Sequence, residues 1–322
     1  MRMPQPDAVR RVAVVGSGYM GGGIAQVFAA HGMECVLVDA SAEQAQRAVD
    51  RLVDQAVEFE SAGLMPQGSA ERIRRNLRAA PSLAEGVADA GFVVEAVPED
   101  LALKTRILAE VSAACPPASI IGTNTSAIPI DTLAAVVSEP TRFVGVHWMN
   151  PAPFVPAVEV IPGEATGSDT VTLVHELLLQ VGKAPCPAPR SAGFIANRLQ
   201  FALFAEACRI VEEGAATTAE IDAVVSNSFG FRLPFFGPFR IADISGLDVY
   251  AGAYESLEAA YGERFHTPAV LTELVEAGKI GVKSGEGFDR YAPDSAAELA
   301  AMRDRAYSAL SALRPTIGWR QP

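Results

Sequence analysis

Histidine is scarce in this chain, and one of its four histidines stands where chemistry is expected. His147 ends the β-favouring run 143–147, and in α/β folds the ends of strands face the ligand crevice. Glu159 lies inside the apolar run 158–161, where a carboxylate is costly unless it is paired. Pairing would fix the His147 tautomer and stabilise its imidazolium, which suits proton exchange with an alcohol during hydride transfer. The alternative is a core histidine and a solvated edge glutamate.

The other three histidines, His31, His175 and His266, stand in polar helical or loop contexts. We expect them to be ordinary surface residues.

A glycine-rich run near the start of the chain predicts a dinucleotide site. Gly16, Gly18 and Gly21 form a Gly-x-Gly-x-x-Gly pattern between the strand-like run 12–15 and a helix-length segment. The first glycine permits a tight turn, the second lets the backbone approach a pyrophosphate, and the third lets the helix pack on the strand. The pyrophosphate would lie at the helix N-terminus, where free N–H groups favour negative charge. Tyr19 and Met20, inside the pattern, join the predicted contacts.

An acidic residue follows the glycine run at the spacing that such sites use. Asp39 ends the second strand-like run, 18 residues after Gly21. Its carboxylate would meet the adenosine ribose hydroxyls and repel a 2′-phosphate, so we expect NAD rather than NADP.

Two further segments gather small and polar side chains. The run 122–126 contains Asn124 and Ser126 and follows a strand-like segment, whereas the run 193–198 places Asn197 on the first turn of a helix. Their hydroxyl and amide groups could contact a ligand, or they could serve only as turn and cap residues.

Apolar strand-like runs alternate with helical patterns through the first 187 residues, which predicts a parallel α/β domain. Expected strands are Val12–Val15, Val36–Val38, Phe92–Ala96, Ser119–Gly122, Phe143–His147 and Ala157–Ile161. Expected helices are a hairpin over Ala42–Arg78 that is interrupted near Gly63 and Pro66, a helix over Leu101–Ala114, and a helix to Val181 that is capped by Ser168.

The pattern changes at residues 184–190, where three prolines predict a stiff, non-helical connector. Beyond it we expect helices over Phe194–Glu213, which Gly214 ends, and over Thr218–Ser228, Leu247–Tyr261 and Pro268–Glu276. The first of these is apolar on most faces, so we expect it to be buried, against a second subunit if not within the chain. The predicted fold is a Rossmann-like α/β domain over 1–187 and an all-α domain over 188–322.

Composition bounds the class of protein. The 322 residues are 49% hydrophobic and 20% charged, enough for two globular domains, and carry a formal charge of −12. The sequence has no basic stripe that would indicate nucleic-acid binding, and its apolar runs are too short to cross a bilayer. The first ten residues are polar and contain no apolar signal segment, so we expect a cytoplasmic protein.

The four cysteines, Cys35, Cys115, Cys186 and Cys208, are scattered, without a Cys-x-x-Cys pair or a nearby histidine. We therefore expect reduced thiols that act as buried filler, and no metal site.

Taken together, the motifs resemble those of the NAD-dependent L-3-hydroxyacyl-CoA dehydrogenases. The shared segments are GSGYMG at 16–21, EAVPE at 95–99, TNTSAIPI at 123–130, His147-x-x-Asn-Pro, AVEVI at 157–161, GFIANRL at 193–199, Gly237-Pro238 and KSGEGF at 283–288. They stand in family order over residues 9 to 291. The resemblance implies a Rossmann-like NAD domain and a helical C-terminal domain that usually dimerises.

By that resemblance, His147 is the general base that takes the proton of a 3-hydroxyl, and Glu159 orients it. Ser126 and Asn197 match residues that hydrogen-bond the reacting oxygen and the neighbouring carbonyl. Glu99 and Lys104 match positions near the nicotinamide ribose.

The sequence departs from the acyl-CoA enzymes in two places. Their helical hairpin usually carries lysines for the CoA phosphates, but residues 61–67 are neutral here. Arg47 and Arg51, one helical turn apart, could substitute or could form a solvated helix face. Arg232, among aromatic residues, looks more like the family's L-gulonate and carnitine dehydrogenase branches, where it would clamp a substrate carboxylate. It could instead be a structural ion pair or an interface residue.

Three hypotheses follow. The first is NAD-dependent oxidation of a 3-hydroxyacyl-CoA to the 3-oxo compound. The second is the same reaction on a free 3-hydroxy acid that Arg232 holds. The third is an NAD-binding structural protein without activity, because a fold alone does not prove a function.

Overall fold

The computed structural model describes residues 9–318, and its chain divides into two units between Leu203 and Phe204. Each unit, N-terminal and C-terminal, is described by itself. The polar first residues, on which the expected location depends, lie mostly outside the described part of the chain. Among residues 9–318, no helix combines the length and the apolar character needed to span a membrane.

The N-terminal unit is built on a sheet to which eight strands contribute within residues 9–318. The strands are β1 (Arg11–Val15), β2 (Glu34–Val38), β3 (Leu77–Ala79), β4 (Phe92–Glu95), β5 (Ile120–Thr123), β6 (Phe143–Trp148), β7 (Ala157–Pro162) and β8 (Ala184–Pro187). Their order is β3-β2-β1-β4-β5-β6-β7-β8, and β1 to β6 run parallel. This is the order of a dinucleotide-binding fold, which confirms the predicted fold class.

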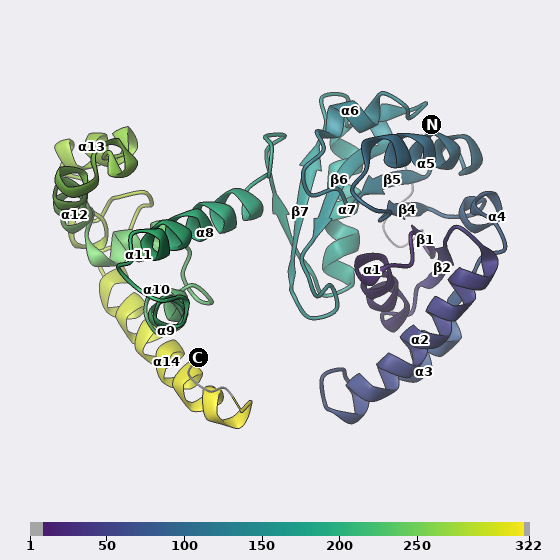
Figure 1. Cartoon of the computed structure of the whole chain (residues 1–322), viewed down its shortest axis with the longest axis horizontal. Coiled ribbons are helices and arrows are strands. Elements are labelled where there is room, and N and C mark those ends of the chain that lie inside the picture. The colour runs from purple at the N-terminus through teal and green to yellow at the C-terminus, as the bar shows by residue number, and fades with distance from the viewer. Residues whose placement is uncertain (1–8, 319–322) are drawn as a thin grey trace. The chain divides into compact units, whose positions relative to one another are not determined.

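Helices cover both faces of the sheet (Figure 1). They are α1 (Tyr19–Ala30), α2 (Ala42–Ser61), α3 (Ser69–Asn76), α4 (Leu83–Val87), α5 (Leu101–Ala114), α6 (Ile130–Ala134), the 3₁₀ turn η2 (Pro140–Arg142) and α7 (Ser168–Gln180). Alternate residues of β1 point to opposite faces: Val12 and Val14 join one core, and Ala13 and Val15 the other. Both faces are thus sealed by buried apolar side chains, which fixes the strand ends rigidly.

Several expectations for this unit need correction. The hairpin helix ends at Asn76, and the next three residues form the edge strand β3 beside β2. The proline-rich connector begins as the edge strand β8, which prolines tolerate. Because β7 is antiparallel to β6, the sheet is not wholly parallel. The N-cap of α7 is Gly167, and Ser168 makes no capping hydrogen bond.

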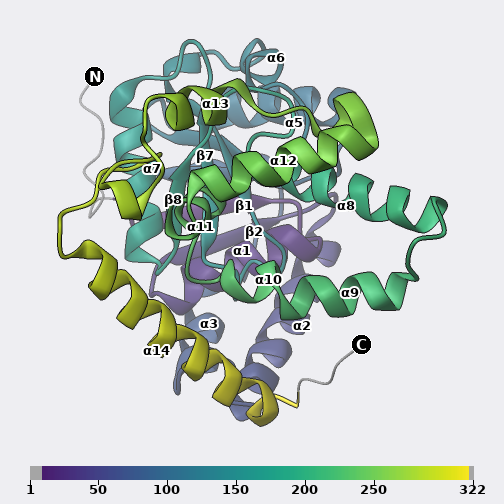
Figure 2. The same ribbon diagram turned by 90° about the vertical axis from the view of Figure 1, so that its left-hand side faces the viewer.

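The C-terminal unit is helical (Figure 2). The helices of this part of the chain are α8 (Ala196–Glu212), α9 (Thr218–Asn227), α10 (Phe229–Arg232), α11 (Pro238–Ser245), α12 (Leu247–Tyr261), α13 (Ala269–Glu276) and α14 (Ser295–Thr316), with 3₁₀ turns η3 (Gly262–Phe265) and η4 (Val282–Ser284). The division between the units falls inside α8. The sequence predicted α8, α9, α12 and α13, but not α10, α11 or α14.

The KSGEGF motif has a structural explanation. Asp243 on α11 is 1% exposed, and its carboxylate accepts the backbone N–H groups of Phe288 and Asp289 and the hydroxyl of Tyr291, the last at 2.7 Å. A side chain at Gly287 would come within 2.2 Å of the Asp243 carboxylate. The motif therefore wraps a buried carboxylate, and burial together with that hydrogen bond raises the pKa of Tyr291 to about 12.

The burial expected for α8 is not found among residues 9–318, because none of the residues of α8 is buried there. Leu199, Phe201 and Phe204 are each more than half exposed. The cysteines also differ from expectation: Cys35 and Cys115 are buried, but Cys208 is partly exposed and Cys186 is exposed.

Candidate active site

A cavity of about 1390 Å³ lies in the N-terminal unit, where the carboxyl ends of β1 to β6 meet. Its walls come from the segments that follow these strands, including the glycine run, Asp39, Glu99, Ser126 and His147. Six parallel strands therefore deliver polar side chains to one place, as an open α/β sheet does at its carboxyl edge.

The glycine run forms one wall, and each glycine has its own steric reason. Gly16 has a φ of 105°, and a Cβ there would lie 2.6 Å from the carbonyl oxygen of Ala96. A Cβ at Gly21 would lie 1.9 Å from the carbonyl oxygen of Gly16, so the helix can approach the turn only without one. A Cβ at Gly18 would meet nothing within 4 Å, which leaves its backbone open to a ligand. Tyr19 and Met20 also line the cavity.

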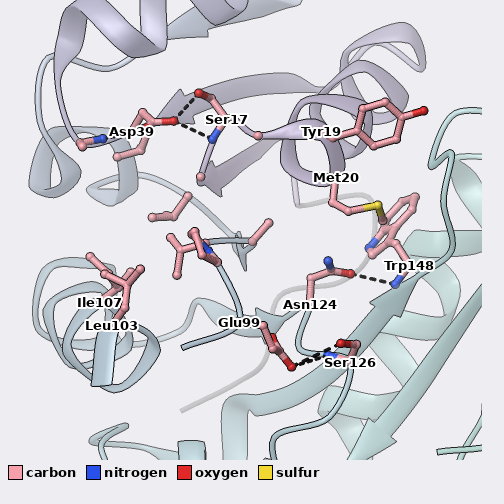
Figure 3. Close-up of a pocket in the computed structure, with 18 of the residues that line it drawn as sticks. Ser17, Tyr19, Met20, Asp39, Glu99, Leu103, Ile107, Asn124, Ser126 and Trp148 are labelled. Atoms are coloured by element: carbon pink, nitrogen blue, oxygen red, sulfur yellow. Dashed lines mark hydrogen bonds between the residues drawn. The ribbon is translucent and has the colours of Figure 1, made fainter. Parts of the chain in front are cut away.

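Asp39 is fastened to the glycine run. Its Oδ2 accepts the Ser17 N–H at 2.9 Å and the Ser17 hydroxyl, and its Oδ1 accepts the Ala40 N–H at 2.6 Å (Figure 3). Burial alone would raise the pKa of this carboxyl, but the bonds from Ser17 and Ala40 outweigh it and lower the pKa. A charged acceptor is thus held at the end of β2, the place predicted for a ribose contact.

Glu99 organises the loop after β5. Its Oε1 accepts the Thr125 hydroxyl at 2.6 Å and the N–H groups of Ser126 and Ala127 at 2.9 Å each (Figure 3). Lys104 Nζ lies 3.4 Å from its Oε2. Burial would raise the pKa of Glu99, but the Thr125 bond, the Lys104 charge and the two amides lower it. Glu99 is therefore a charged anchor for the segment that carries Ser126.

Lys104 lies behind this wall rather than in it. It is 1% exposed, and its Nζ donates to Glu95 Oε1 at 2.7 Å and to the Val97 carbonyl at 3.0 Å. Glu95, fully buried, also accepts the Thr123 hydroxyl at 2.6 Å. Lys104 is not among the residues that line the cavity, so any effect it has on a cofactor must pass through residues that do, such as Val97 and Glu99.

Asn124 ties β5 to β6 at the cavity. Its Oδ1 accepts the Trp148 N–H at 2.9 Å (Figure 3). The Trp148 side chain is 2% exposed and packs edge-on against Phe28, with ring centroids 5.7 Å apart. Asn124 thus fixes the strand end from which His147 projects.

His147 and Glu159 face each other across the antiparallel strands β6 and β7. His147 Nδ1 lies 2.8 Å from Glu159 Oε2, and both side chains are less than 10% exposed. Because Nδ1–H donates to the carboxylate, Nε2 is left as the proton acceptor, and it has no partner among residues 9–318. His147 lines the cavity.

Glu159 has a second task that the sequence did not reveal. Its Oε1 accepts the N–H groups of Ile195 and Ala196, both at 2.9 Å, at the start of α8. Phe194, with a φ of 51°, turns the chain there and packs its ring 5.5 Å from the imidazole. One carboxylate therefore orients the histidine and also accepts the free N–H groups at the N-terminus of α8.

Ser126 and Asn197 meet beside this pair. Asn197 Nδ2 donates to the Ser126 carbonyl at 3.2 Å, and both residues line the cavity with His147. The structure thus brings together all four predicted catalytic residues: His147, Glu159, Ser126 and Asn197.

The predicted arginines fall elsewhere. Arg47 is exposed and pairs with Glu43 one turn away, as in a solvated helix face. Arg51 donates to the Ser17 carbonyl at 3.1 Å and lines a second cavity, of about 530 Å³, with Tyr19, Phe59 and Phe154. Arg232 belongs to α10 in the C-terminal unit and does not line the first cavity.

Sequence reasoning missed part of the lining. Leu103, Ile107 and Glu110 on α5 line the cavity, and their spacing of four and three residues is the available signal of one helix face. Gln200, one turn after Asn197, is the other clear omission.

In residues 9–318, no group of three histidine, cysteine or acidic side chains is arranged to hold a metal.

Lys183 was also missed. Its side chain is mostly buried, and its Nζ donates to the carbonyls of Ala152, Pro153 and Val155, the last at 2.9 Å. Burial lowers the pKa of this amine. Lys183 holds the loop that follows His147 in place.

The fold, the glycine run and the acidic strand end define a dinucleotide-binding enzyme site. The model of the 3-hydroxyacyl-CoA dehydrogenase NAD-binding domain matches residues 11–191, and that of the same family's C-terminal domain matches residues 193–291.

Relatives agree with these matches. A 5-formyl-3-hydroxy-2-methylpyridine 4-carboxylate 5-dehydrogenase of Mesorhizobium japonicum is 32% identical over 92% of this chain and 96% of its own length. A 3-hydroxyadipyl-CoA dehydrogenase of Escherichia coli is 37% identical over 87% of this chain, which spans 58% of that protein. The crystal structure of a 3-hydroxyacyl-CoA dehydrogenase from Archaeoglobus fulgidus is 33% identical and has a TM-score of 0.78, covering 97% of this chain and all of that one.

The chain belongs to the 3-hydroxyacyl-CoA dehydrogenase family. It is an NAD-dependent oxidoreductase that acts on CH–OH groups, as the motifs predicted.

Proposed function

We propose that this protein oxidises the 3-hydroxyl of a 3-hydroxyacyl-CoA to the 3-oxo compound, reversibly, with His147 and Glu159 as the general acid–base pair. One observation carries the proposal: His147, whose Nε2 has no partner among residues 9–318, lines the same cavity as the glycine run and Asp39. A proton acceptor and a dinucleotide cradle therefore share one space.

The residues present fit NAD. The exposed backbone of Gly18 at the start of α1 suits the pyrophosphate, and the charged Asp39 suits the adenosine ribose hydroxyls while repelling a 2′-phosphate. Glu99 and Asn124 lie in the part of the cavity that includes Ser126, which suits the nicotinamide ribose. When bound, NAD supplies the hydride acceptor.

The side chains of this protein carry out the proton transfer. His147 Nε2 takes the proton of the 3-hydroxyl, and the Glu159 carboxylate, fixed by Ile195 and Ala196, stabilises the imidazolium that results. Ser126 and Asn197 donate to the reacting oxygen and the neighbouring carbonyl. In the reverse direction the imidazolium returns the proton.

The second cavity supports a long substrate. It shares Gly18 and Tyr19 with the first and combines apolar side chains such as Phe59 and Phe154 with the guanidinium of Arg51. Such a surface suits the remainder of a thioester. Arg47 is engaged by Glu43, which favours Arg51 as the cationic contact.

A substrate panel followed by NADH absorbance tests the proposal. Oxidation of 3-hydroxybutyryl-CoA, L-gulonate and carnitine is compared under identical conditions with NAD and NADP. We expect turnover of the thioester with NAD. Turnover of only the free acids would remove the thioester from the proposal.

The role of His147 has its own test. His147→Gln should lower kcat by roughly 10²–10⁴-fold, because general acid–base catalysis contributes about that much. The affinity for NAD, measured by calorimetry, should stay near that of wild type. Loss of NAD binding in this variant would instead indicate a structural histidine.

A free 3-hydroxy acid is the second candidate substrate. The relative from Mesorhizobium japonicum is named for a pyridine carboxylate, and it matches nearly the whole of both chains. Arg232, the predicted carboxylate contact, has no acidic partner in residues 9–318. A sharp rise in KM for a carboxylate substrate in Arg232→Ala would support this candidate, and an unchanged KM would contradict the role.

We also propose a homodimer that forms through the C-terminal unit, located in the cytoplasm. The exposed apolar side chains of α8 support the dimer, because a helix of that character is normally covered.

A further inference from the structure

The C-terminal unit contains a small cavity of its own, apart from the residues assigned above to NAD. Its volume is about 260 Å³, and its walls come from α10, α11 and α14. Four polar side chains line it: Arg232, Ser245, Arg303 and Tyr307. A cavity of this size accommodates a carboxyl group and a few carbon atoms rather than a whole cofactor.

Three of the four polar side chains of this cavity have no hydrogen-bonding or ionic partner in the described part of the chain. The side chains of Arg232, Ser245 and Tyr307 make no hydrogen bond or ion pair to any of residues 9–318. Arg303 contacts only the adjacent Asp304, whose side chain is 68% exposed. The chain has 38 acidic and 26 basic residues, so a partly buried arginine without a carboxylate is not explained by a shortage of acids.

Other arginines of the same unit show what structural pairing looks like. Arg264 bonds both Glu206 and Glu213, and Arg240 donates to Asp289 at 2.8 Å. Arg232 has no equivalent partner in the described residues, although its backbone carbonyl accepts the N–H groups of Phe235 and Phe236. Arg232 therefore lines the cavity, and no acidic side chain of residues 9–318 neutralises its guanidinium.

The helix α14 holds the arginine segment in place. The Tyr307 ring packs against Phe231 and Phe236, with centroids 5.6 and 6.3 Å apart. Arg314 donates to the Asn227 side chain at 2.9 Å and lies 4.5 Å over the Phe231 ring. α14, yellow in Figure 2, lies beyond residues 193–291, which the C-terminal family model matches. It contributes the second guanidinium, that of Arg303.

We propose that this cavity binds the carboxylate of a small organic acid, with Arg232 and Arg303 as its two guanidinium contacts and Ser245 and Tyr307 as hydroxyl donors. Guanidinium groups match carboxylates through paired hydrogen bonds. Because Asp304 offsets the charge of Arg303, the site favours a singly charged carboxylate over a phosphate dianion. The assignment of that carboxylate to a substrate rests on the second candidate function.

Calorimetry on the full chain tests the site directly. The probes are 3-hydroxybutyrate, L-gulonate and carnitine, together with 3-hydroxybutyramide, which lacks the charge. We expect saturable binding of at least one acid and none of the amide. Arg232→Ala and Arg303→Ala should weaken binding roughly tenfold to a hundredfold, as for charged hydrogen bonds. Arg305→Ala is the matched control, because Arg305 is exposed on the same helix and does not line the cavity.

Three results would overturn the site. These are absence of binding of all three acids to wild type, equal binding of the amide and its acid, and affinity in Arg232→Ala and Arg303→Ala equal to that of Arg305→Ala. The melting temperature of each variant identifies one that has merely lost its fold. Arg303→Lys, which keeps the charge, serves as the conservative variant in the same measurement.

Kinetics separates the two sources of the carboxylate. If it belongs to the substrate, Arg303→Ala raises KM for the acid about tenfold and leaves that for 3-hydroxybutyryl-CoA unchanged. If the acid is a separate effector, its addition changes thioester turnover in wild type but not in Arg303→Ala. Failure of the proposed function would appear differently, as absent turnover of every substrate with acid binding intact in calorimetry.

Discussion

The two units differ in what they bury. The N-terminal unit packs apolar side chains on both faces of its sheet and pairs its buried charges, as Glu95 does with Lys104. The C-terminal unit has a small core around Leu247 and Leu271 and leaves large side chains such as Phe204 in solvent. All residues that line the first cavity therefore belong to the N-terminal unit, whereas the C-terminal unit has surface that another molecule can cover.

The largest effect is expected where buried polar groups are most tightly coupled. Glu159→Gln keeps an oxygen for the amides of Ile195 and Ala196 but presents an N–H group to His147, which selects the wrong tautomer. We expect kcat to fall by about 10²–10⁴-fold with a nearly unchanged melting temperature.

Glu159→Ala is the companion variant. It removes both the contact with His147 and the acceptor for the N–H groups at the start of α8. We therefore expect kcat and the melting temperature to fall together. Equal melting temperatures for the two variants would show that the carboxylate does not hold the helix.

The glycine run offers a sharper comparison within the N-terminal unit. Gly21→Ala forces a Cβ against the carbonyl oxygen of Gly16, and overpacking of this kind costs about 1–3 kcal/mol or more. Gly18→Ala meets open space, so it should leave the melting temperature unchanged and weaken NAD binding. Thermal unfolding and NAD titration of both variants check this, and a Gly18→Ala protein with wild-type NAD affinity would contradict the cradle.

Next in size is the expected change in assembly. Phe204→Glu places a charge on the exposed apolar surface of α8 and should shift a dimer toward monomer in sedimentation velocity. Leu179→Glu is the control, because Leu179 is 53% exposed on α7 of the N-terminal unit. A dimer that survives the first substitution, or dissociates equally with the second, rules out α8 as the interface.

The smallest effect concerns a surface histidine of the C-terminal unit. A hydrogen bond from His266 to Glu258 raises the pKa of His266 above 6.5. Because the pKa of His266 is higher in the folded than in the unfolded state, the pair contributes its full stabilisation below pH 6.5. This contribution is lost as the pH rises through the pKa of the folded state. The melting temperature of His266→Gln should therefore fall below that of wild type more at pH 5.5 than at pH 8.5.

Glu258→Gln should reproduce that pH dependence, because it removes the same pair. A difference between wild type and His266→Gln that is constant with pH would argue against the pairing.

Much of the fold could be predicted because it depends on local pattern. The helices over Leu101–Ala114 and Leu247–Tyr261 were predicted with the bounds that the structure has. The edge strands β3 and β8 were not, because short strands are defined by their neighbours: β3 pairs with β2, and β8 with β7. α14 was also missed, although a continuous helix spans Ser295–Thr316.

The candidate site also has residues that the sequence could predict and residues whose position it could not. Gly16, Gly18, Gly21 and Asp39 could be predicted from their spacing within one strand–helix–strand unit, and the structure places Gly16, Gly18 and Asp39 in the wall of one cavity. Lys104 was expected near the cofactor but is buried between Glu95 and Glu99, since sequence spacing does not reveal how deeply a helix packs.

By itself the sequence determined the fold class, the family, the use of NAD, and the presence of a histidine at a strand end, because each is encoded by neighbouring residues. Only the tertiary structure decided that Glu159, besides pairing with His147 as the sequence predicted, also binds the start of α8, and that Arg232 shares a cavity with Arg303. The contacts that were not predicted join residues 36 to 71 positions apart, and backbone folding brings them together. No local pattern records which distant groups will meet.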